Sequence, residues 1–508
     1  METIIKKITD NEIENDKIIK TAAEIISRGG LVAFPTETVY GLGGDSFDPA
    51  AAEKIYAAKG RPSDNPLIVH ISEFDDIYKL SDEVPEIAKV LADKFWPGPL
   101  TMIVKKNKSV PVTVTGGLDT VAVRLPSHKV ARKLIKESGT FIAAPSANIS
   151  GRPSPTTAKH VIDDLNGRID MIIDDGSIEI GLESTIVDLT EDVPVILRPG
   201  YVTFEMLEET VGKVRLDKAL MTGVKGNVKP KAPGMKYRHY APKAELTIIE
   251  GSPEKTVARI EELVKEAERK GQKAGIMLSE ENFDKICSDY KLCLGSSSDE
   301  NEIARNLFAC LRKFDDMDID VIFSEGFSEE GIGQAIMNRL LKAAGHKIIE
   351  VYNILYDKVI FVCRENNCQS PAAVTILNSI KKDEWLEVSS RGLVVLFSEP
   401  YSMKIHSLLR NHGIIMDNGV SRPLEEKDFG ENTLILTMTR AQKDKILSEY
   451  KNACNVYSIM EFAGGNGDIF DPYGGDNAVY EMFYSSIHTW VNQVEIKLHQ
   501  LNTKEDLK

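Results

Sequence analysis

The sequence predicts an α/β fold throughout, divided into about three domains. Strand and helix patterns alternate along most of the 508 residues, which is typical of α/β proteins. The length favours about three domains at roughly 150 residues each. A segment over residues 222–243 is rich in Lys, Gly and Pro, has little apolar periodicity and interrupts the alternation. We therefore predict a first domain, a linker, a second domain and a third domain at residues 1–212, 213–243, 244–354 and 355–508.

The composition is that of an ordinary globular protein and excludes several classes. The longest apolar runs fall far short of the ~18 residues that span a bilayer, and the N-terminus lacks the apolar stretch of a signal peptide. Six cysteines without a paired-loop framework indicate a reduced, cytoplasmic protein. The net charge of −15 disfavours non-specific nucleic-acid binding as the main activity, so clustered cations are informative.

In the first domain, a helix is expected over residues 16–30, followed by a buried strand at 31–36. Asp48 suits the N-cap of the next helix, Pro49 its first turn and Gly60 its C-terminal stop. The remaining strands of this domain are expected at residues 67–72, 100–105, 120–126, 140–146, 171–176, 184–190 and 195–200.

The later domains show the same alternation. In the second domain, strands are expected at residues 244–251, 274–279 and 321–327. In the third domain, we expect a strand at 355–363, a helix from Ser370, a strand at 434–439 and a C-terminal helix near 479–500.

Short polar segments follow two of the predicted strands or helices. FPTETVYGLGGD places Thr36, Glu37 and Thr38 directly after a buried strand, at the end where ligands of open α/β sheets bind. KGRPSDNPL holds Lys59 and Arg61 on a loop that prolines restrain. Taken alone, each segment is also explained as a polar or solvated basic turn.

Other segments of the first domain add cations and hydroxyl groups. Arg124 lies in an apolar strand, where it faces solvent or a bound anion. The segment SANISGRPSPT contains Ser146, Asn148, Ser150 and Ser154, and its hydroxyls and backbone amides suit phosphate and ribose. Ser184 and Arg198 add polar groups next to strand ends. Together these segments predict an anion-binding pocket without a cysteine nucleophile or the ligand spacing of a zinc site.

The first domain closely resembles the YrdC-like domain of threonylcarbamoyl-AMP synthases. The resemblance rests on five motifs that occur in the same order, FPTETVYGLGGD, KGRPSDNPL, SANISGRPSPT, STIVD and LRPG. PGMKYRHYAP at residues 233–242 is similar to the linker of the longer, two-domain members, and AIMNRLLKAAG at 335–345 to the end of their second domain. The resemblance covers about the first 350 residues. It implies a twisted open sheet for the first domain and a smaller Rossmann-like α/β fold for the second.

The resemblance implies an activity and its partners. The family condenses L-threonine, bicarbonate and ATP, with Mg²⁺ on the phosphates, into L-threonylcarbamoyl-AMP and releases pyrophosphate. A separate tRNA threonylcarbamoyl transferase complex then uses the product. We expect no membrane association and no metal held by protein ligands, and weak RNA binding is compatible with the resemblance.

The resemblance also implies residue roles. The positions matching threonine contacts are Thr36, His70, Arg124, Ala144 and Ser184. The positions matching ATP contacts are Arg61, Asn65, Thr120, Ser146, Ser154, Arg198 and Tyr240. Lys59 is expected to face phosphates, and Lys59, Arg61 and Arg124 to do most to position the reactants and stabilise charge. The linker residues Tyr237, His239 and Tyr240 are expected to close over the site as a lid.

The third domain resembles low-molecular-weight tyrosine and arginine phosphatases over residues 357–500, which implies a flavodoxin-like fold. CRENNCQSP, from Cys363, is similar to their phosphate-binding loop. By position, Cys363 matches the nucleophile, Ser370 the hydroxyl that follows the loop, and Asp471 the general acid in DPYGG.

Two residues of this loop depart from the phosphatase pattern. Gln369 occupies the position of the arginine that clamps phosphate, and Glu365 a position usually taken by glycine. Loss of a bidentate guanidinium removes transition-state stabilisation, and a carboxylate nearby repels a phosphate dianion. We therefore expect this domain to be inactive or severely impaired, and hypothesise a reversible disulfide between Cys363 and Cys368.

Other functions are compatible with parts of the sequence. A YrdC-like surface could bind RNA or a nucleotide without catalysis, although such a surface needs no threonine pocket and aromatic residues make up only 7% of the chain. The third domain could be the active part, as a phosphatase, which Gln369 argues against. Carbamoyl transfer of the hydrogenase-maturation kind uses a related domain, but its zinc-finger and acylphosphatase segments are not visible here.

Overall fold

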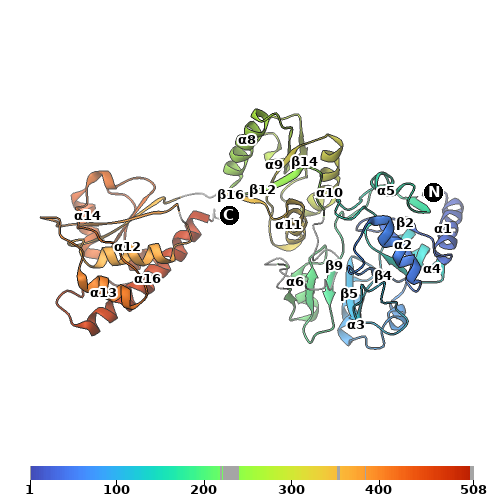
Figure 1. Cartoon of the computed structure of the whole chain (residues 1–508), viewed down its shortest axis with the longest axis horizontal. Coiled ribbons are helices and arrows are strands. Elements are labelled where there is room, and N and C mark those ends of the chain that lie inside the picture. Colours follow the sequence, from blue (N-terminus) through green and yellow to red (C-terminus); the bar gives the residue numbers. More distant parts are fainter. Residues whose placement is uncertain (1, 218–219, 221–239, 352–354, 384, 504–508) are drawn as a thin grey trace. The chain divides into compact units, whose positions relative to one another are not determined.

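The structure is a computed structural model that describes residues 2–217, 220, 240–351, 355–383 and 385–503. It divides into two compact units, residues 1–350 and 351–508, which are described separately (Figure 1). Both units consist of sheets with flanking helices, which confirms the predicted α/β class.

The first unit contains a mixed eleven-stranded sheet with the strand order β1-β8-β2-β3-β7-β4-β6-β5-β9-β10-β11. Its strands are β1 (Ile4–Lys7), β2 (Val32–Phe34), β3 (Gly41–Asp45), β4 (Ile68–His70), β5 (Leu100–Lys105), β6 (Thr120–Arg124), β7 (Ile142–Ala144), β8 (Met171–Asp174), β9 (Thr185–Asp188), β10 (Val195–Arg198) and β11 (Arg215–Leu216). Strands were thus correctly predicted at all eight expected places in this domain.

The helices of this region begin and end where local chemistry directs. The Asp48 side chain caps α2 by accepting a hydrogen bond from the Ala50 amide at 2.9 Å, and Gly60 ends it with φ of 63°, as expected. Helix α1 begins earlier than predicted because Asn11 caps it by accepting from the Glu14 amide. The helices are α1 (Glu12–Ser27), α2 (Pro49–Lys59), the 3₁₀ helix η1 (Phe74–Lys79), α3 (Glu86–Phe95), α4 (Lys129–Ser138), α5 (Ala158–Leu165) and α6 (Phe204–Val211).

Strand register brings polar residues from distant parts of the sequence together. In the parallel pair of β4 and β6, His70 lies opposite Arg124. In the antiparallel pair of β4 and β7, Ile68 lies opposite Ala144. Strand β4 therefore has residues that the sequence places in one site on both sides, Arg124 opposite its last residue and Ala144 opposite its first.

A second sheet completes the first unit, with the order β14-β13-β15-β12-β16. A single buried apolar cluster contains residues from both sheets' layers, which explains why residues 1–350 form one unit. The elements are β12 (Glu245–Gly251), α8 (Pro253–Arg269), β13 (Ala274–Leu278), α9 (Glu280–Phe283), β14 (Lys291–Cys293), α10 (Glu300–Asp316), β15 (Val321–Glu325), α11 (Gly331–Ala344) and β16 (Ile348–Val351).

The second unit is built on a four-stranded parallel sheet in the order β18-β17-β19-β20. In a doubly wound sheet of this order, ligands bind beside the carboxyl end of the first strand, here β17. The elements are β17 (Lys358–Cys363), α12 (Gln369–Ile380), β18 (Glu387–Gly392), α13 (Met403–Asn411), the 3₁₀ helix η2 (Glu426–Asp428), β19 (Thr433–Thr437), α14 (Arg440–Glu449), β20 (Val456–Ser458), α15 (Ile459–Phe462) and α16 (Asn477–Thr503).

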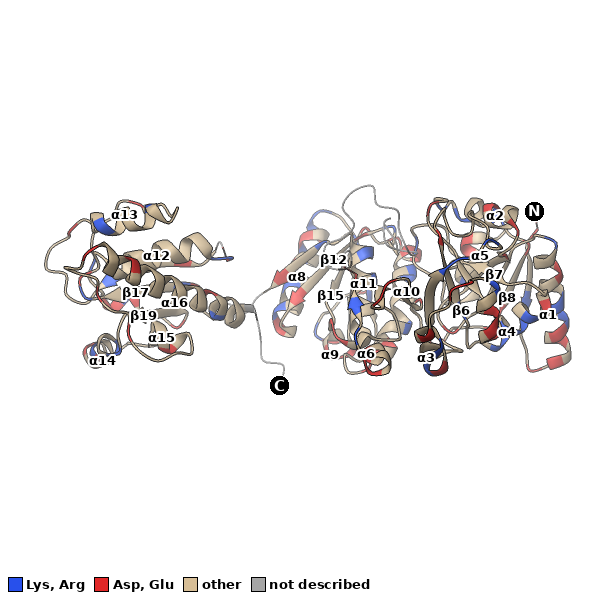
Figure 2. Cartoon of the chain, turned by 90° about the horizontal axis from the view of Figure 1, so that it is seen from below, with Lys and Arg blue, Asp and Glu red and all other residues tan. Residues whose placement is uncertain are grey.

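Charged residues lie mainly outside the sheets. In Figure 2, positions of acidic and basic residues alternate along flanking helices such as α1 and α8, while the strands are mostly coloured as uncharged. Among the described residues, no helix is both long and apolar enough to cross a membrane.

Candidate functional site

A pocket in the first unit collects most of the polar residues that the sequence predicts for the site. It is formed by β4 and the ends of β6, β7 and β10, together with the loops after β2, α2 and β7 and the residues directly before β9. The predicted site residues that line it are Thr36, Arg61, His70, Arg124, Ala144, Ser146, Ser154, Ser184, Arg198 and Tyr240. Arginine side chains, small hydroxyls and backbone thus surround one cavity, as expected for a pocket that binds anions.

Backbone carbonyls hold the Arg61 guanidinium in place through only some of its hydrogen-bond donors. Its Nε donates to the Asn65 carbonyl at 3.3 Å and its Nη2 to the Pro66 carbonyl at 3.0 Å. Among the described residues, its Nη1 makes no hydrogen bond. Burial lowers the pKa of Arg61 to about 10, so an anion beside it would offset an unfavourable desolvation.

Arg198, the last residue of β10, is also held by a backbone carbonyl group. Its Nε and Nη2 donate to the Ser184 carbonyl at 3.1 and 2.9 Å, and Nη2 also reaches the Ser184 hydroxyl at 3.2 Å. That hydroxyl shares a hydrogen bond of 2.7 Å with Thr101 on β5. Within the described part of the chain, Nη1 of Arg198 is without a hydrogen-bond partner. Among the residues that the structure describes, both guanidinium groups are thus held by backbone carbonyls and keep Nη1 available for a ligand.

Arg124 is anchored by a buried ion pair. Its Nη2 donates to Glu37 Oε1 at 2.7 Å and its Nη1 to the Thr38 hydroxyl at 2.9 Å. Burial raises the pKa of Glu37, but the charge and hydrogen bond of Arg124 outweigh this and leave that pKa lowered. The second oxygen, Oε2, is buried without a hydrogen-bond partner among the described residues. Glu37 thus fixes the orientation of Arg124 from behind, because Glu37 itself does not line the pocket.

His70 lies between Arg124 and the edge of Phe34. Its Nδ1 is 3.1 Å from the Ile68 carbonyl, and its ring meets that of Phe34 edge-on with centroids 6.2 Å apart. Burial, together with the charge of Arg124, lowers the pKa of His70 to about 3. His70 is therefore neutral at every pH at which the protein is expected to work, and serves as a polar, uncharged wall of the pocket.

The pKa of His70 predicts how stability changes with acid. A histidine in the unfolded chain has a pKa of about 6.5. Below this pH the unfolded chain binds a proton at His70, whereas folded His70, with a pKa of about 3, stays neutral. The free energy of unfolding falls as the pH falls, by about 1 kcal/mol at pH 5.5 from this residue. We expect His70→Asn to remove that part of the loss.

Denaturant titrations at pH 7.5 and 5.5 test this expectation. A Trp385→Phe, Trp490→Phe background leaves Trp96 as the reporter in the first unit, since the chain has 3 tryptophans. His346→Asn, at an exposed histidine of the same unit, is the matched control and should keep the wild-type pH dependence. An equal loss of stability in His70→Asn and wild type would contradict the burial of a neutral His70.

Of the residues that the resemblance assigns to threonine, ATP or phosphate contacts, three do not line the pocket. Lys59 is buried and donates from Nζ to the carbonyls of Ser146 and Asn148, so it supports the pocket loop from behind. Asn65 is buried, and its Oδ1 has no hydrogen-bond partner among the described residues. Thr120 begins β6, opposite Lys105.

Glu183 lines the pocket but was not selected from the sequence. It accepts a hydrogen bond from Ser154 and another from Nε of Arg339 on α11 at 3.1 Å. Arg339 is fully buried and also donates to the Pro199 carbonyl. The signal available in the sequence was a carboxylate directly before Ser184; its arginine partner, 156 residues later, could not be recognised without the fold.

Tyr240 places the end of the linker in the pocket. Its ring stacks on Phe308 of α10 with centroids 5.2 Å apart, and Arg339 lies over its face at 6.0 Å. Thr38, Val39, Gly41, Ile68, Pro145 and Asn148 complete the lining. The predicted lid residues Tyr237 and His239 lie outside the described residues.

The predicted phosphatase-like residues also come together, in the second unit. Cys363 ends β17 beside the N-terminus of α12, and its sulfur accepts from the Asn366 amide at 3.2 Å and lies 3.0 Å from the Ser370 hydroxyl. Asn366 adopts the left-handed conformation with φ of 58° and donates from Nδ2 to Ser370 at 3.0 Å. The loop geometry is therefore internally braced around a buried thiol.

Gln369 uses its amide within the protein. Its Nε2 donates to the carbonyls of Ile469 and Phe470 at 3.3 and 3.1 Å, directly before Asp471. Cys363 and Cys368 are free thiols, and burial raises the pKa of Cys368 to about 12, with Asp471 adding to the effect. Because thiolates are the reactive form, the raised pKa of Cys368 slows its attack on another sulfur. The reversible disulfide between Cys363 and Cys368 stays a prediction.

No protein ligand set for a metal is present among the described residues, where no three His, Cys, Asp or Glu side chains are grouped suitably. In the pocket, the carboxylate of Glu183 is already paired with Arg339 and Ser154.

Comparison with known families finds three family models that match successive parts of the chain. A family model described as "Telomere recombination" matches residues 24–200, and one described as the C-terminal domain of threonylcarbamoyl-AMP synthase matches residues 202–345. A model for low molecular weight phosphotyrosine protein phosphatases matches residues 358–506.

Individual relatives match over the first unit. A threonylcarbamoyl-AMP synthase of Pyrococcus abyssi is 51% identical over 349 residues, which is 69% of this chain and 100% of the relative. The Bacillus subtilis protein of the same name is 48% identical over 343 residues, 67% of this chain and 97% of the relative. A solved structure of P. abyssi Sua5 complexed with L-threonine is 49% identical, covers 69% of this chain and all of that one, and has a TM-score of 0.65.

Proposed function

This chain belongs to the threonylcarbamoyl-AMP synthase family of enzymes, and on that premise we propose how its pocket divides between the two larger substrates. L-Threonine occupies the side formed by Thr36, His70 and Arg124. ATP occupies the side formed by Arg61, Arg198 and the loop that carries Ser146 and Ser154, which we call the loop side. The observation that carries the proposal is the presence of rigidly mounted guanidinium groups on both sides of one pocket.

On the threonine side, a guanidinium fixed by Glu37 suits a carboxylate. Arg124 is oriented before ligand binds, so little conformational entropy is lost when the threonine carboxylate docks. The carboxylate would give Arg124 a second negative partner, on the side that faces the pocket. The solved relative whose structure holds L-threonine supports this side of the proposal.

On the ATP side, Arg61 and Arg198 each offer Nη1 to phosphate oxygens. Their buried positions strengthen such contacts, since charge–charge interactions are stronger away from water. Ser146 and Ser154 add hydroxyls from the loop that Lys59 supports. When bound to the nucleotide, Mg²⁺ would neutralise part of the phosphate charge, while Arg61 and Arg198 would hold the phosphates.

The chemistry then needs positioning more than acid–base help. The threonine amine, having lost a proton, attacks bicarbonate to form a carbamate with loss of water. A carbamate oxygen next attacks the α-phosphorus, the bond to the bridging oxygen breaks, and pyrophosphate leaves with that electron pair. Arg61 and Arg198 would stabilise the charge that develops on the phosphates. The linker end at Tyr240 helps exclude water from the hydrolysable product.

We propose that the product supplies a tRNA threonylcarbamoyl transferase complex in the cytoplasm. Incubation of the full chain with ATP, threonine and ¹³C-bicarbonate should yield an adenylate that carries one ¹³C, detected by mass spectrometry. Chelation of Mg²⁺ should abolish the product and added Mg²⁺ restore it. An adenylate of threonine without the ¹³C label would contradict the carbamate route.

A further inference from the structure

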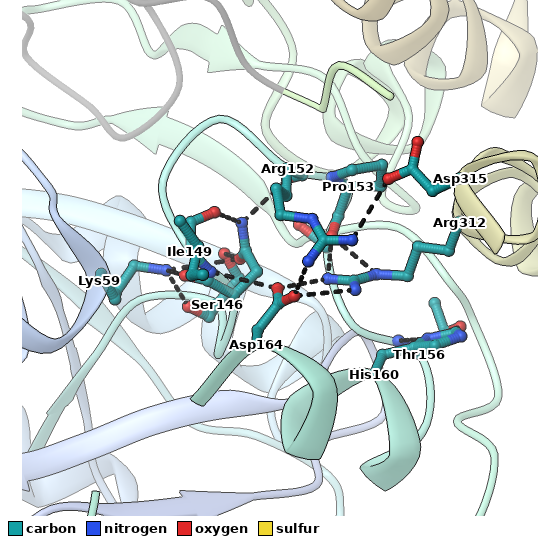
Figure 3. Close-up of polar contacts among 12 residues, drawn as sticks. Lys59, Ser146, Ile149, Arg152, Pro153, Thr156, His160, Asp164, Arg312 and Asp315 are labelled. Carbon is teal, nitrogen blue, oxygen red and sulfur yellow. Dashed lines mark hydrogen bonds and ion pairs between the residues drawn. The ribbon is translucent and has the colours of Figure 1, made fainter. Parts of the chain in front are cut away.

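A buried polar network joins helix α10 of the second sheet to the pocket loop at residues 146–154. Figure 3 shows Arg152 and Arg312 both directed at Asp164, while Lys59 approaches the Ser146 end of the loop from the other side. Asp164, on α5, has a side chain with 0% exposure. Such a buried carboxylate is stable only with well-placed partners, so the network constrains whatever it touches.

Arg312 holds both the carboxylate and the loop. Its Nη2 donates to Asp164 Oδ2 at 2.8 Å, and its Nε and Nη2 donate to the Pro153 carbonyl at 3.1 and 2.6 Å. The Arg312 side chain is 5% exposed. Because Pro153 directly precedes Ser154, which lines the pocket, Arg312 sets the position of a pocket residue that it does not touch.

The rest of the loop is fastened to the same carboxylate. Asp164 also accepts from Arg152 and from the Ile149 amide, the latter at 3.2 Å. Asn148, a lining residue, donates from Nδ2 to the Arg152 carbonyl at 2.9 Å and accepts from the Ser146 hydroxyl at 2.6 Å. The loop is thus folded around Asp164, and Lys59 closes its other side.

Asp315, one helical turn after Arg312, fastens the end of the linker. It accepts from the Lys243 amide at 2.7 Å and from Arg152 at 3.3 Å. The Ala241 amide donates to the Gly151 carbonyl at 2.9 Å. The chain immediately after Tyr240 is therefore attached both to the pocket loop and to α10.

We propose that Arg312, assisted by Asp315, is a positioning residue for the nucleotide side of the pocket. Helix α10 would thereby give the second α/β domain a direct part in the reaction. The inference rests on the proposed assignment of the loop side of the pocket to ATP. Without Arg312, the Pro153 carbonyl loses its buried donors and the loop relaxes. Arg124 keeps its ion pair with Glu37, and His70 keeps its contact with the Ile68 carbonyl.

The test is a set of steady-state measurements of threonine-dependent pyrophosphate release by the full chain. We expect Arg312→Gln to raise KM for ATP about 10- to 100-fold while KM for threonine changes less than about 3-fold, since one lost charge-assisted anchor has effects of this order. Arg312→Lys should restore part of the ATP affinity. Asp164 keeps Arg152 as an ion-pair partner in these variants, so no buried carboxylate is left without a cation.

The matched control is Arg305→Gln on the same helix. Arg305 also donates to the first domain, from Nε to the Glu179 carbonyl at 2.9 Å, but it does not touch the pocket loop. Both KM values should stay near wild type in this variant. Unchanged KM values in Arg312→Gln, equal increases for both substrates, or the same effect in Arg305→Gln would overturn the inference. A wild-type chain without threonine-dependent release would instead overturn the proposed function.

Discussion

Replacing Arg124 by methionine together with Glu37→Gln is expected to lower threonine-dependent pyrophosphate release about 100- to 1,000-fold. The substitution removes the guanidinium proposed to hold the threonine carboxylate, a charge-assisted contact worth about 3–4 kcal/mol when desolvated. Both side chains of the natural pair are 5% exposed. Arg124→Met alone would leave Glu37 buried without a cation at a cost of about 3–5 kcal/mol, so the double variant separates function from folding.

Rates with varied threonine and ATP, and ATP binding by calorimetry, measure the outcome. The ATP affinity should change little, because Arg61 and Arg198 keep their backbone mounts. Arg132→Met, at an exposed arginine on α4, is the control and should behave as wild type. Wild-type threonine dependence in the Arg124 variant would remove Arg124 from the threonine site.

The third domain is expected to gain phosphatase activity at least about 100-fold when Gln369→Arg and Glu365→Gly are combined. A guanidinium at position 369 could clamp phosphate bidentately, and such a contact contributes a few kcal/mol to transition-state stabilisation. In the natural chain, the Gln369 amide donates to the Ile469 and Phe470 carbonyls. The Glu365 side chain, which is 51% exposed, adds negative charge to the loop.

Hydrolysis of p-nitrophenyl phosphate by the natural chain and the double variant provides the measurement. Cys363→Ser in the variant background should abolish the gained activity, because the thiolate is the expected nucleophile. High activity in the natural chain, lost in Cys363→Ser, would show that the loop works without its arginine. Persistent inactivity of a folded double variant would mean that more than these two positions disables the loop.

Local signals in the sequence predicted elements well. Asp48, Pro49 and Gly60 framed α2 because capping and left-handed turns depend on single residues and their immediate neighbours. The strand before Thr36 was equally recognisable from its apolar run. Helix α1 began earlier than expected because Asn11, rather than an apolar residue, sets its first turn.

Much of the site was also predictable, since strand ends carry their polar residues to one edge of a sheet. The position of Lys59 was not predictable: a lysine beside Arg61 suggests phosphate binding, yet the fold directs its amine to the Ser146 and Asn148 carbonyls. Contacts such as Arg312 with Pro153, 159 residues apart, depend on packing between two sheets and leave no local pattern.

The most direct test is pyrophosphate release from Mg²⁺-ATP by the full chain, with threonine and bicarbonate supplied together, singly or not at all. We expect pyrophosphate release to require both threonine and bicarbonate. Serine in place of threonine should support release poorly. These results would place the threonine, carbamate and nucleotide chemistry in one active site. Release that is independent of threonine, or ATP binding without any release, would contradict the proposed synthase site.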